Sequence, residues 1–510
     1  MSSSKQNEGA SDVTLPRIGE SDPSYWQVVN KRFNKRYVAR PDYVRRVSST
    51  QEVVAAVQEA VTEKQRLVVT SGGHCLENFV SDPTARVIID ISPMKRIYCD
   101  QEKRAVAVEA GATVGETFQA LFDNWGVVVP LGEHPGIGMG GHVPGGPFGF
   151  LCRQLGLAAD YLSAVEVVTV DQNGKANSVI ATSEASDLNR ELWWAHTGGG
   201  AGNFGVATRF WFRDPSAAGD DPAEFLPAAP PSITTFKAEW NWADVDQGSF
   251  LKLLQNHGDW SEKNSAAASP NATLWTLLEI HRQQFGRIVV RGVSTAGAGA
   301  PAQADQYLAA LSAGLTKPVG PEVTQMSWLE FALNPLPDLF AAPPGGVSTK
   351  VKDALIKKRF TDKQIEIAYE YLTRTDFDVM GGMFGLATYG GRINTVARDA
   401  TASVQRDAIL DVACTTGWLD PQDEENNMRW AREFYRDLFA ETGGVPVPNA
   451  QYDGTFINHP DNDLADSIWN TSGVPWSKLY YNENYPRLRE IKARWDPLNI
   501  FHHALSIEGA

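Results

Sequence analysis

The residues of this chain that could do chemistry begin with Ser71, Gly72, Gly73 and His74, which directly follow the apolar run 67–70. Two successive glycines let the backbone approach an anion closely and point its N–H groups at it. The imidazole of His74, at the edge of this turn, could serve as a ligand, a base or a covalent attachment point. Because glycine pairs after strands also form plain turns, the prediction of a phosphate cradle needs further signals.

Two more glycine-rich segments supply those signals. They cover residues 132–149 and 197–208. A glycine costs about 1 kcal/mol relative to alanine inside a helix, so neither segment is the interior of a regular element. Three such loops between apolar strands predict one large cofactor, flat or charged, that is gripped along its length.

The elements that must position these loops alternate between helices and strands, which indicates an α/β or α+β fold. A capping-box-like start at Ser49 predicts one helix, and a second opens at 111 and runs through 121. Strands are expected first at residues 66–70, 87–90, 105–108, 161–170, 179–181 and 204–212. Beyond a Pro- and Ala-rich linker at 214–231, we expect strands at 234–240, 272–279, 287–293 and 379–387, helices at 302–313, 361–374 and 426–442, and a surface loop at 335–346.

Composition excludes several classes of function. The formal net charge of −15, without any cluster of Lys and Arg, argues against nucleic acid as a partner. No apolar run approaches the ~20 residues that a membrane span needs. Four cysteines without close spacing predict no disulfide framework. The first ten residues lack the apolar stretch of a signal peptide. They predict a flexible N-terminal tail and a cytoplasmic protein.

Six short motifs occur in this chain, at residues 71–74, 136–142, 157–160, 202–206, 389–392 and 484–501. In order and spacing they resemble those of berberine-bridge-enzyme-like FAD oxidases, which belong to the vanillyl-alcohol-oxidase superfamily. The resemblance covers about residues 24–507. Within the family it is greatest to microbial oxidases that tailor secondary metabolites, such as the hexose oxidases of glycopeptide antibiotic pathways.

This resemblance implies an α+β, two-domain FAD-binding fold of the vanillyl-alcohol-oxidase type with an inserted antiparallel-sheet substrate domain. It divides the chain into a disordered tail (1–23), the first part of the FAD-binding domain (24–214), the substrate-binding domain (215–465) and a C-terminal return to the FAD-binding domain (466–510). Periodicity alone would not predict that return.

The resemblance also implies FAD, bonded covalently from the ring of His74 to the 8α carbon of the isoalloxazine. Many relatives add a second bond from a cysteine, and His134 stands at that place. Imidazole lacks the soft sulfur nucleophile, so we expect a single attachment. No metal is expected, because His134 and His142 match no common ligand spacing. The cofactor-binding residues implied are Ser71, Gly72, Gly73, His74, Cys75, His134, Gly138, Gly140, Gly141, His142, Gly145, Gly146, Gly202, Asn203, Gly205, Val206, Tyr480, Asn482 and Asn484.

The implied reaction transfers a hydride from an alcohol or similar C–H to the flavin, which molecular oxygen reoxidises with formation of hydrogen peroxide. A base must then take the hydroxyl proton. His459 occupies the family's tyrosine position, and imidazole can act near neutral pH, although it could equally hydrogen-bond its own loop. Tyr389 is the second catalytic candidate, with a role as a packed aromatic as the alternative. Phe148 and Phe456 stand where hydroxyls are frequent, which predicts a hydrophobic natural product as substrate.

Other functions stay open. The absence of the family's usual tyrosines at positions 148, 456 and 459 also fits a flavin-containing enzyme that catalyses a redox-neutral cyclisation or isomerisation in a biosynthetic pathway. Substrate-dependent oxygen uptake separates the two. An NAD(P) dehydrogenase, suggested by the glycine pattern at 136–141, lacks a clear first βαβ unit. A non-catalytic binding protein is disfavoured by three intact cofactor loops.

Overall fold

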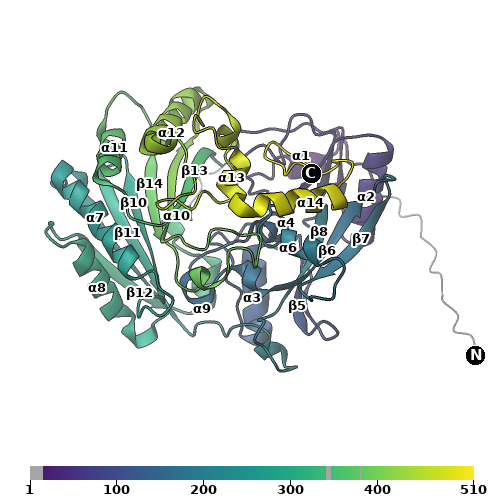
Figure 1. Ribbon diagram of the computed structural model, residues 1–510, viewed down its shortest axis with the longest axis horizontal. Helices are drawn as coiled ribbons and strands as arrows, with labels where there is room; N and C mark the ends of the chain where they lie inside the picture. The colour runs from purple at the N-terminus through teal and green to yellow at the C-terminus, as the bar shows by residue number, and fades with distance from the viewer. Residues whose placement is uncertain (1–14, 341–345, 380) are drawn as a thin grey trace, which may run out of the picture.

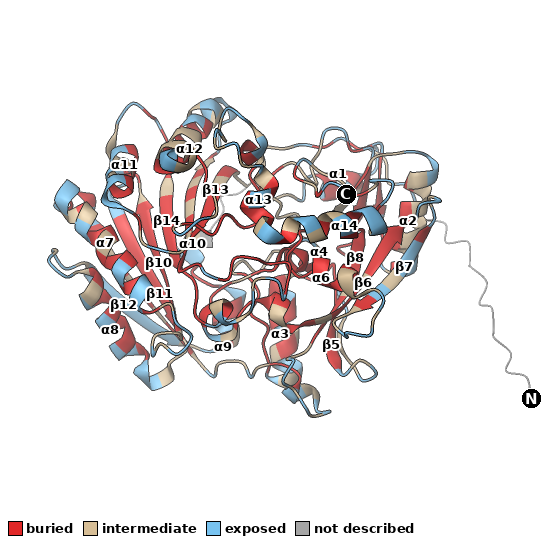
Figure 2. Ribbon diagram, in the orientation of Figure 1, coloured by how far each residue is buried: buried red, intermediate tan, exposed pale blue. Residues whose placement is uncertain are grey.

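The computed structural model describes residues 15–340, 346–379 and 381–510, and its strands form three sheets in two lobes (Figure 1). One lobe contains two smaller sheets and the C-terminal helices. The other contains one large sheet with helices over one face. Most strand residues are buried, whereas the helices expose one side to solvent (Figure 2). The predicted α+β class is confirmed.

The smallest sheet is parallel and has the order β1 (Tyr43–Arg46), β3 (Val87–Asp90), β2 (Leu67–Thr70). Helix α2 (Thr50–Thr62) begins after Ser49, whose side chain accepts a hydrogen bond from the Glu52 N–H. This is the predicted N-cap. Because β2 ends at Thr70, it delivers the glycine pair and His74 to the carboxyl edge of the sheet.

The second sheet is antiparallel, in the order β4 (Ile97–Asp100), β5 (Ala105–Glu109), β8 (Val206–Phe212), β6 (Leu162–Val170), β7 (Ala176–Thr182). Helix α3 (Val114–Trp125) follows β5 and begins with a complete capping box between Thr113 and Glu116. The short helix α4 (Met139–His142) lies within the second glycine-rich segment, and the third segment runs into the start of β8, so both segments include a few residues of regular structure, against the prediction. Shorter helices in this lobe are α1 (Pro23–Val29), α5 (Cys152–Leu155) and α6 (Arg190–Ala195).

The large antiparallel sheet has the order β12 (Val319–Met326), β9 (Ile233–Asn241), β11 (Arg287–Ser294), β10 (Leu274–His281), β14 (Met383–Thr388), β15 (Leu410–Trp418), β13 (Ser348–Ile356). Helices α7 (Gln247–Lys263), α8 (Ala300–Leu311), α11 (Asp362–Thr373) and α12 (Glu424–Leu438) lie over its outer face (Figure 1). Its inner face is turned toward the first lobe, and α9 (Trp328–Leu333) packs against α3.

The C-terminal segment contacts the first lobe. It contains α13 (Trp476–Tyr481) and α14 (Tyr485–Trp495), and α14 packs on α6. Arg487 forms an ion pair with Glu191 at 2.6 Å, and the buried Lys492 ammonium donates to the Asn203 carbonyl at 2.8 Å.

The expected disordered tail at 1–23 falls largely on residues outside the described part of the chain. In its described part, Ile18 and Val44 exchange two backbone hydrogen bonds, at 3.0 and 2.9 Å.

Several elements were missed from the sequence. Strands β12, β13 and β15 and helix α7 were not predicted. The expected loop at 335–346 contains the short helix α10 (Pro337–Phe340), and its residues 341–345 lie outside the described part. Strand β13 escaped notice because Lys350, Lys352 and Asp353 make it look polar, although all three side chains are buried. Within the described residues, no helix is long and apolar enough to cross a membrane.

Candidate active site

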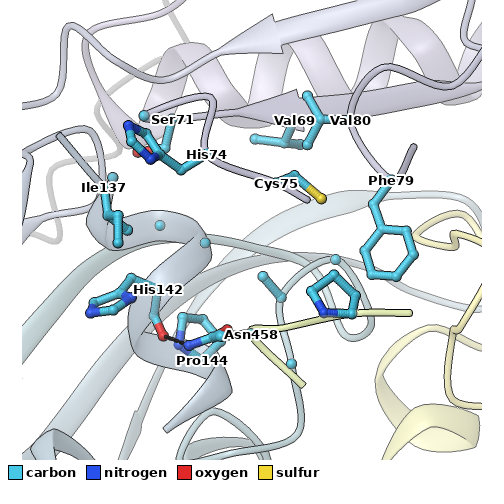
Figure 3. A pocket seen from close by; sticks show the side chains of 18 of the residues that line it. Val69, Ser71, His74, Cys75, Phe79, Val80, Ile137, His142, Pro144 and Asn458 are labelled. Atoms are coloured by element: carbon cyan, nitrogen blue, oxygen red, sulfur yellow. Dashed lines mark hydrogen bonds between the residues drawn. The ribbon is translucent and has the colours of Figure 1, made fainter. Parts of the chain in front are cut away.

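A cavity of about 400 Å³ lies between the two lobes, and all three glycine-rich segments line it. Figure 3 shows Ser71, His74 and Cys75 along one side and Ile137, His142 and Pro144 along the other. The large sheet contributes Asp411, and the segment after it contributes Phe456 and His459. The volume is within the range of ~300–1,000 Å³ that is usual for ligand pockets.

The Ser71–His74 turn is fixed by contacts that leave its N–H groups available. The Ser71 hydroxyl donates to the Ala110 carbonyl at 2.7 Å. A Cβ at Gly72 would lie 2.2 Å from the backbone nitrogen of Gly138, so the first two glycine segments touch through bare backbone. Among the described residues, none accepts a backbone hydrogen bond from the N–H groups of Gly72, Gly73 or His74. Unpaired backbone N–H groups in a glycine turn are the kind of group that binds an anion.

The ring of His74 lies within the cavity wall among other rings. Phe33 stacks on it with 5.1 Å between ring centroids, and the ring of His134 lies 4.6 Å away. Burial, followed by the nearby His134 and Lys31, lowers the pKa of His74 to about 3. The imidazole is therefore neutral at pH 7 and retains a nucleophilic nitrogen lone pair.

Helix α4 carries the second glycine segment along the cavity. His142 is buried, and its Nε2 accepts a hydrogen bond from the Gly132 N–H at 2.9 Å. Burial also lowers the pKa of His142 to about 3, so this ring is a neutral structural acceptor. A Cβ built on Gly141 meets no described atom within 4 Å, whereas one on Gly140 would lie 3.0 Å from the Ala110 oxygen. Gly141 therefore faces open cavity and Gly140 faces protein.

The third glycine segment meets the C-terminal residues at another part of the cavity. Gly200 and Gly202 adopt φ values of +84° and +76°, which favour glycine. Phe79 stacks on His503 with 3.9 Å between ring centroids, and both line the cavity. The ring of His503 contacts the Ala201 carbonyl at 3.2 Å, so the C-terminal segment and the third glycine segment are joined.

The part of the cavity against the large sheet combines apolar rings with ionisable groups. The Phe148 and Phe456 ring centroids are 4.7 Å apart, and the His459 ring lies 5.3 Å from that of Phe456. The carboxyl groups of Glu133 and Asp411 line the same region. Burial raises the pKa of Glu133 to about 7, which poises this carboxyl to exchange a proton near neutral pH.

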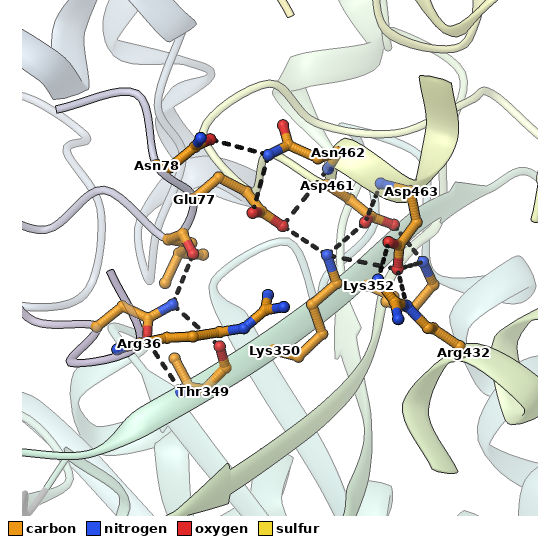
Figure 4. Close-up of polar contacts among 12 residues, drawn as sticks. Arg36, Glu77, Asn78, Thr349, Lys350, Lys352, Arg432, Asp461, Asn462 and Asp463 are labelled. Carbon is orange, nitrogen blue, oxygen red and sulfur yellow. Dashed lines mark hydrogen bonds and ion pairs between the residues drawn. The ribbon is translucent and has the colours of Figure 1, made fainter. Parts of the chain in front are cut away.

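A buried ionic cluster holds the segment that carries His459 (Figure 4). The Lys350 ammonium contacts Glu77 at 2.5 Å and Asp461 at 2.6 Å, and Lys352 contacts Asp461 at 2.5 Å and Asp463 at 3.0 Å. These side chains come from both lobes. Breaking such a pair leaves an uncompensated buried charge, at a cost of about 3–5 kcal/mol. The segment after His459 is therefore rigidly placed.

Comparison with known proteins also indicates FAD, the cofactor that the sequence resemblance implied. A family model described as "FAD binding domain" matches residues 41–177, and one described as "Berberine and berberine like" matches residues 455–508. Aclacinomycin-N/aclacinomycin-A oxidase of Streptomyces galilaeus is 46% identical over 497 residues, which are 97% of this chain and 90% of that protein. This chain belongs to the berberine-bridge-enzyme-like FAD-linked oxidases.

Solved structures agree over the same length. Aclacinomycin oxidoreductase matches this oxidase with a TM-score of 0.93 at 45% identity, covering 97% of this chain and 100% of that one. A glycopeptide hexose oxidase complexed with teicoplanin gives a TM-score of 0.93 at 42% identity, covering 97% and 99%. The predicted vanillyl-alcohol-oxidase-type FAD-binding fold is confirmed. The chain is an FAD-linked oxidoreductase of the kind that tailors secondary metabolites.

The residues of this oxidase fit FAD. The free N–H groups of the Ser71–His74 turn suit the pyrophosphate, and the bare backbone at Gly141 admits a flat ring system. The predicted residues that line the cavity are Ser71, Gly72, Gly73, His74, Cys75, His134, Gly138, Gly140, Gly141, His142, Gly202, Gly205, Val206 and His459.

Seven predicted residues of the oxidase do not line the cavity: Gly145, Gly146, Asn203, Tyr480, Asn482, Asn484 and Tyr389. Three of them form hydrogen bonds with backbone groups of other residues. The Asn203 amide donates to the Gly199 carbonyl at 3.1 Å, the Tyr480 hydroxyl accepts from the Asp461 N–H at 2.9 Å, and the Asn484 amide donates to the Arg398 carbonyl at 3.0 Å.

The structure does not bring Tyr389 to the cavity, against the prediction of a catalytic role. Its side chain is buried behind Phe148, and its hydroxyl contacts the Gln405 carbonyl at 3.3 Å. Burial raises the pKa of Tyr389 well above its usual range, so its phenol stays protonated. Cys152 is also buried and does not line the cavity, so it packs inside the protein.

Sequence reasoning missed Glu133, Asp353 and Asp411. Asp353, Asp411 and His459 present three ligand atoms within 4.8 Å of one another, a spacing that could hold a metal ion. Glu133 had a signal in the sequence, because it directly precedes His134 in the second glycine segment. Asp353 and Asp411 had none, since only sheet pairing brings them together.

Proposed function

We propose that this oxidase takes a hydride from an alcohol or similar C–H of a small natural product, with His459 receiving the hydroxyl proton. The observation that carries this proposal is that His459 and His74 line one cavity. FAD, when bound, supplies the hydride acceptor and is reoxidised by molecular oxygen to give hydrogen peroxide. The chain's own part is to exclude water, orient the carbon and accept the proton.

The covalent link to FAD is assigned to His74 alone. Its neutral ring, with a pKa lowered to about 3 by burial, supports a nucleophilic attachment. The neighbouring His134 has its Nδ1 engaged by the Gly136 N–H at 3.0 Å. The cavity-lining Cys75 is a poor second candidate, because burial raises the pKa of its thiol to about 11 and keeps it protonated.

FAD is assigned to the residues of 24–214 that line the cavity together with the C-terminal return from 466. The substrate is assigned to the region beside residues 215–465. Support for the second assignment comes from the apolar ring of Phe456, which contacts the His459 ring and also packs against Phe148. The names of relatives point the same way, since one oxidises aclacinomycins, one is solved with teicoplanin and one with pregilvocarcin. A hydrophobic natural product is the substrate class that fits.

A second candidate is a redox-neutral cyclisation or isomerisation. It is favoured by one observation: no tyrosine is among the described residues that line the cavity. His459 and Glu133 could then move protons without net oxidation. Oxygen consumption with a turned-over substrate supports the oxidase, and product formation without oxygen consumption supports this alternative.

The test begins with purified holoenzyme. Acid precipitation should leave the yellow colour in the protein pellet, which establishes a covalent flavin. A panel of polycyclic and glycosylated natural products is then screened for oxygen uptake and peroxide formation. Colour that is released entirely into the supernatant refutes the covalent link, while reduction by no member of the panel under anaerobic conditions counts against the substrate class.

A further inference from the structure

The contacts of His459 single out one of its two ring nitrogens. Its Nδ1 lies 3.4 Å from Asp353 Oδ2, and its side chain is 33% exposed toward the cavity that it lines. Asp353 is completely buried on β13. Its other oxygen, Oδ1, accepts hydrogen bonds from the Thr455 hydroxyl at 2.5 Å and the Phe456 N–H at 2.8 Å. Asp353 therefore fixes both the backbone before His459 and the orientation of its ring.

A second carboxyl stands beside the first. Asp411 on β15 is paired with Leu355 on β13, so its side chain emerges on the same face of the sheet as that of Asp353, two residues away. Asp411 lines the cavity, and its buried Oδ1 has no hydrogen-bond partner among the described residues. The ligand atoms of Asp353, Asp411 and His459 lie within 4.8 Å of one another.

Two carboxyl groups this close do not both ionise. Burial and the neighbouring Asp353 charge raise the pKa of Asp411 well above its usual range. Burial alone would raise the pKa of Asp353 as well, but the hydrogen bond and charge of His459, together with hydrogen bonds from Asp411 and Thr455, outweigh it and lower that pKa. The pair therefore carries one proton, which is on Asp411, and one negative charge, which faces the imidazole.

We propose that Asp353 and Asp411 are a pair of positioning residues that prepare His459 to accept a proton at Nε2. Asp353 holds the proton of the ring on Nδ1, so the lone pair of Nε2 points into the cavity. Asp411 keeps its own proton and limits the negative charge beside the ring to one unit, so that the ring is not held permanently as imidazolium. This inference rests on the proposed function of His459 as the base.

The proton balance of the step is simple. The O–H bond of the substrate breaks, an N–H bond forms at Nε2, and the imidazolium charge is met by the Asp353 carboxylate. As the carbon–oxygen bond becomes a carbonyl, the C–H electron pair would leave as hydride, for which a bound flavin would supply the acceptor. Glu133 and His142 are titratable groups that also interact electrostatically with His459. Their separate titrations must be recognised in any pH profile.

The test reads the ring directly and needs no substrate. Nitrogen NMR of holoenzyme with labelled histidine, assigned with His459→Gln, reports the tautomer and the titration midpoint of His459. We expect Nδ1 to carry the proton in the neutral wild-type ring. Asp353→Asn should lower the midpoint by about 1–3 pH units, since it removes the opposite charge. Asp411→Asn mimics a protonated acid and should leave the midpoint almost unchanged.

Charge-matched Asp305→Asn, on exposed α8, controls for removal of one carboxylate. A proton on Nε2 in the wild type overturns the proposal even if the Asp353 variant fails to fold. An Asp411→Asn shift as large as that of Asp353→Asn also overturns it, because Asp411 would then be ionised. So does a spectrum that EDTA changes and Zn²⁺ restores, because a metal would occupy the cluster. If the NMR result is as expected but substrate reduces the flavin of His459→Phe at the normal rate, only the role of His459 as the base is refuted.

Discussion

Replacement of Gly141 by valine separates FAD binding from folding. Gly141 belongs to α4, is exposed to the cavity, and would place a Cβ where no described atom lies within 4 Å. In a helix, valine is a few tenths of a kcal/mol more favourable than glycine, so the fold should not lose stability. The added isopropyl group instead projects into the space assigned to the flavin.

The expected magnitude follows from the cost of overpacking. Forcing extra carbons into a filled site costs roughly 1–3 kcal/mol. At about 1.4 kcal/mol per factor of ten, FAD should bind roughly 5- to 140-fold more weakly before any covalent bond forms. Purified Gly141→Val should therefore contain substoichiometric flavin. The ratio of flavin to protein absorbance measures this, and thermal unfolding confirms the fold.

Two comparison variants make the result specific. Gly248→Val lies in the first turn of α7, where a Cβ approaches only Asp246 Oδ1 at 3.7 Å, and it should keep both flavin and stability. Gly140→Val directs its side chain into the Ala110 oxygen and Ile91, at 3.0 Å each, and should unfold at lower temperature. A full complement of flavin in folded Gly141→Val would refute the placement of the cofactor against α4.

Three further predictions concern histidines. His74→Ala should abolish the flavin mass increment in intact-protein mass spectrometry, and any surviving covalent adduct would contradict a single attachment. His459→Phe should keep the flavin but slow its anaerobic reduction by substrate by about 10²–10⁴-fold. In the wild type, the reduction rate should fall as acid protonates the imidazole. Equal reduction rates in the two proteins would show that another group is the base. Burial lowers the pKa values of His142 and His503 to about 3. Below pH ~6.5 the unfolded chain therefore binds protons that the native protein does not. The free energy of unfolding should decrease as the pH falls from about 6.5 toward 3. Urea unfolding midpoints at pH 7 and pH 5 measure this effect, which a flat profile would exclude.

The cofactor side of the site could be predicted from the sequence because its chemistry is local. The turn at Gly72 and Gly73 needs glycine where backbones touch, and His74 is carried by the same turn. Such requirements leave a signature within a few consecutive residues. The strands that deliver these loops were predicted for the same reason, since they are short apolar runs with turn residues at their ends.

The substrate side could not be predicted, because its groups meet only through long-range pairing. Asp353 and Asp411 are far apart in sequence and become neighbours through the pairing of β13 with β15. The polar appearance of β13 concealed a buried strand, since its charges are neutralised by residues from other segments. Tyr389 shows the same limit from the other side: its motif is visible in the sequence, but the choice between its two predicted roles depends on packing against Phe148.

The ionic cluster explains how two distant imidazoles can be held in one cavity. Glu77 follows His74 by three residues, and Asp461 follows His459 by two. The Lys350 ammonium contacts both carboxylates, at 2.5 and 2.6 Å, and it is almost fully buried. Movement of either segment would leave a buried charge unpaired, at a cost of about 3–5 kcal/mol. A well-packed apolar pair could stabilise the fold equally, but a small shift of one segment against the other would then cost much less free energy. The distance between the rings of His74 and His459 therefore depends on the buried charges.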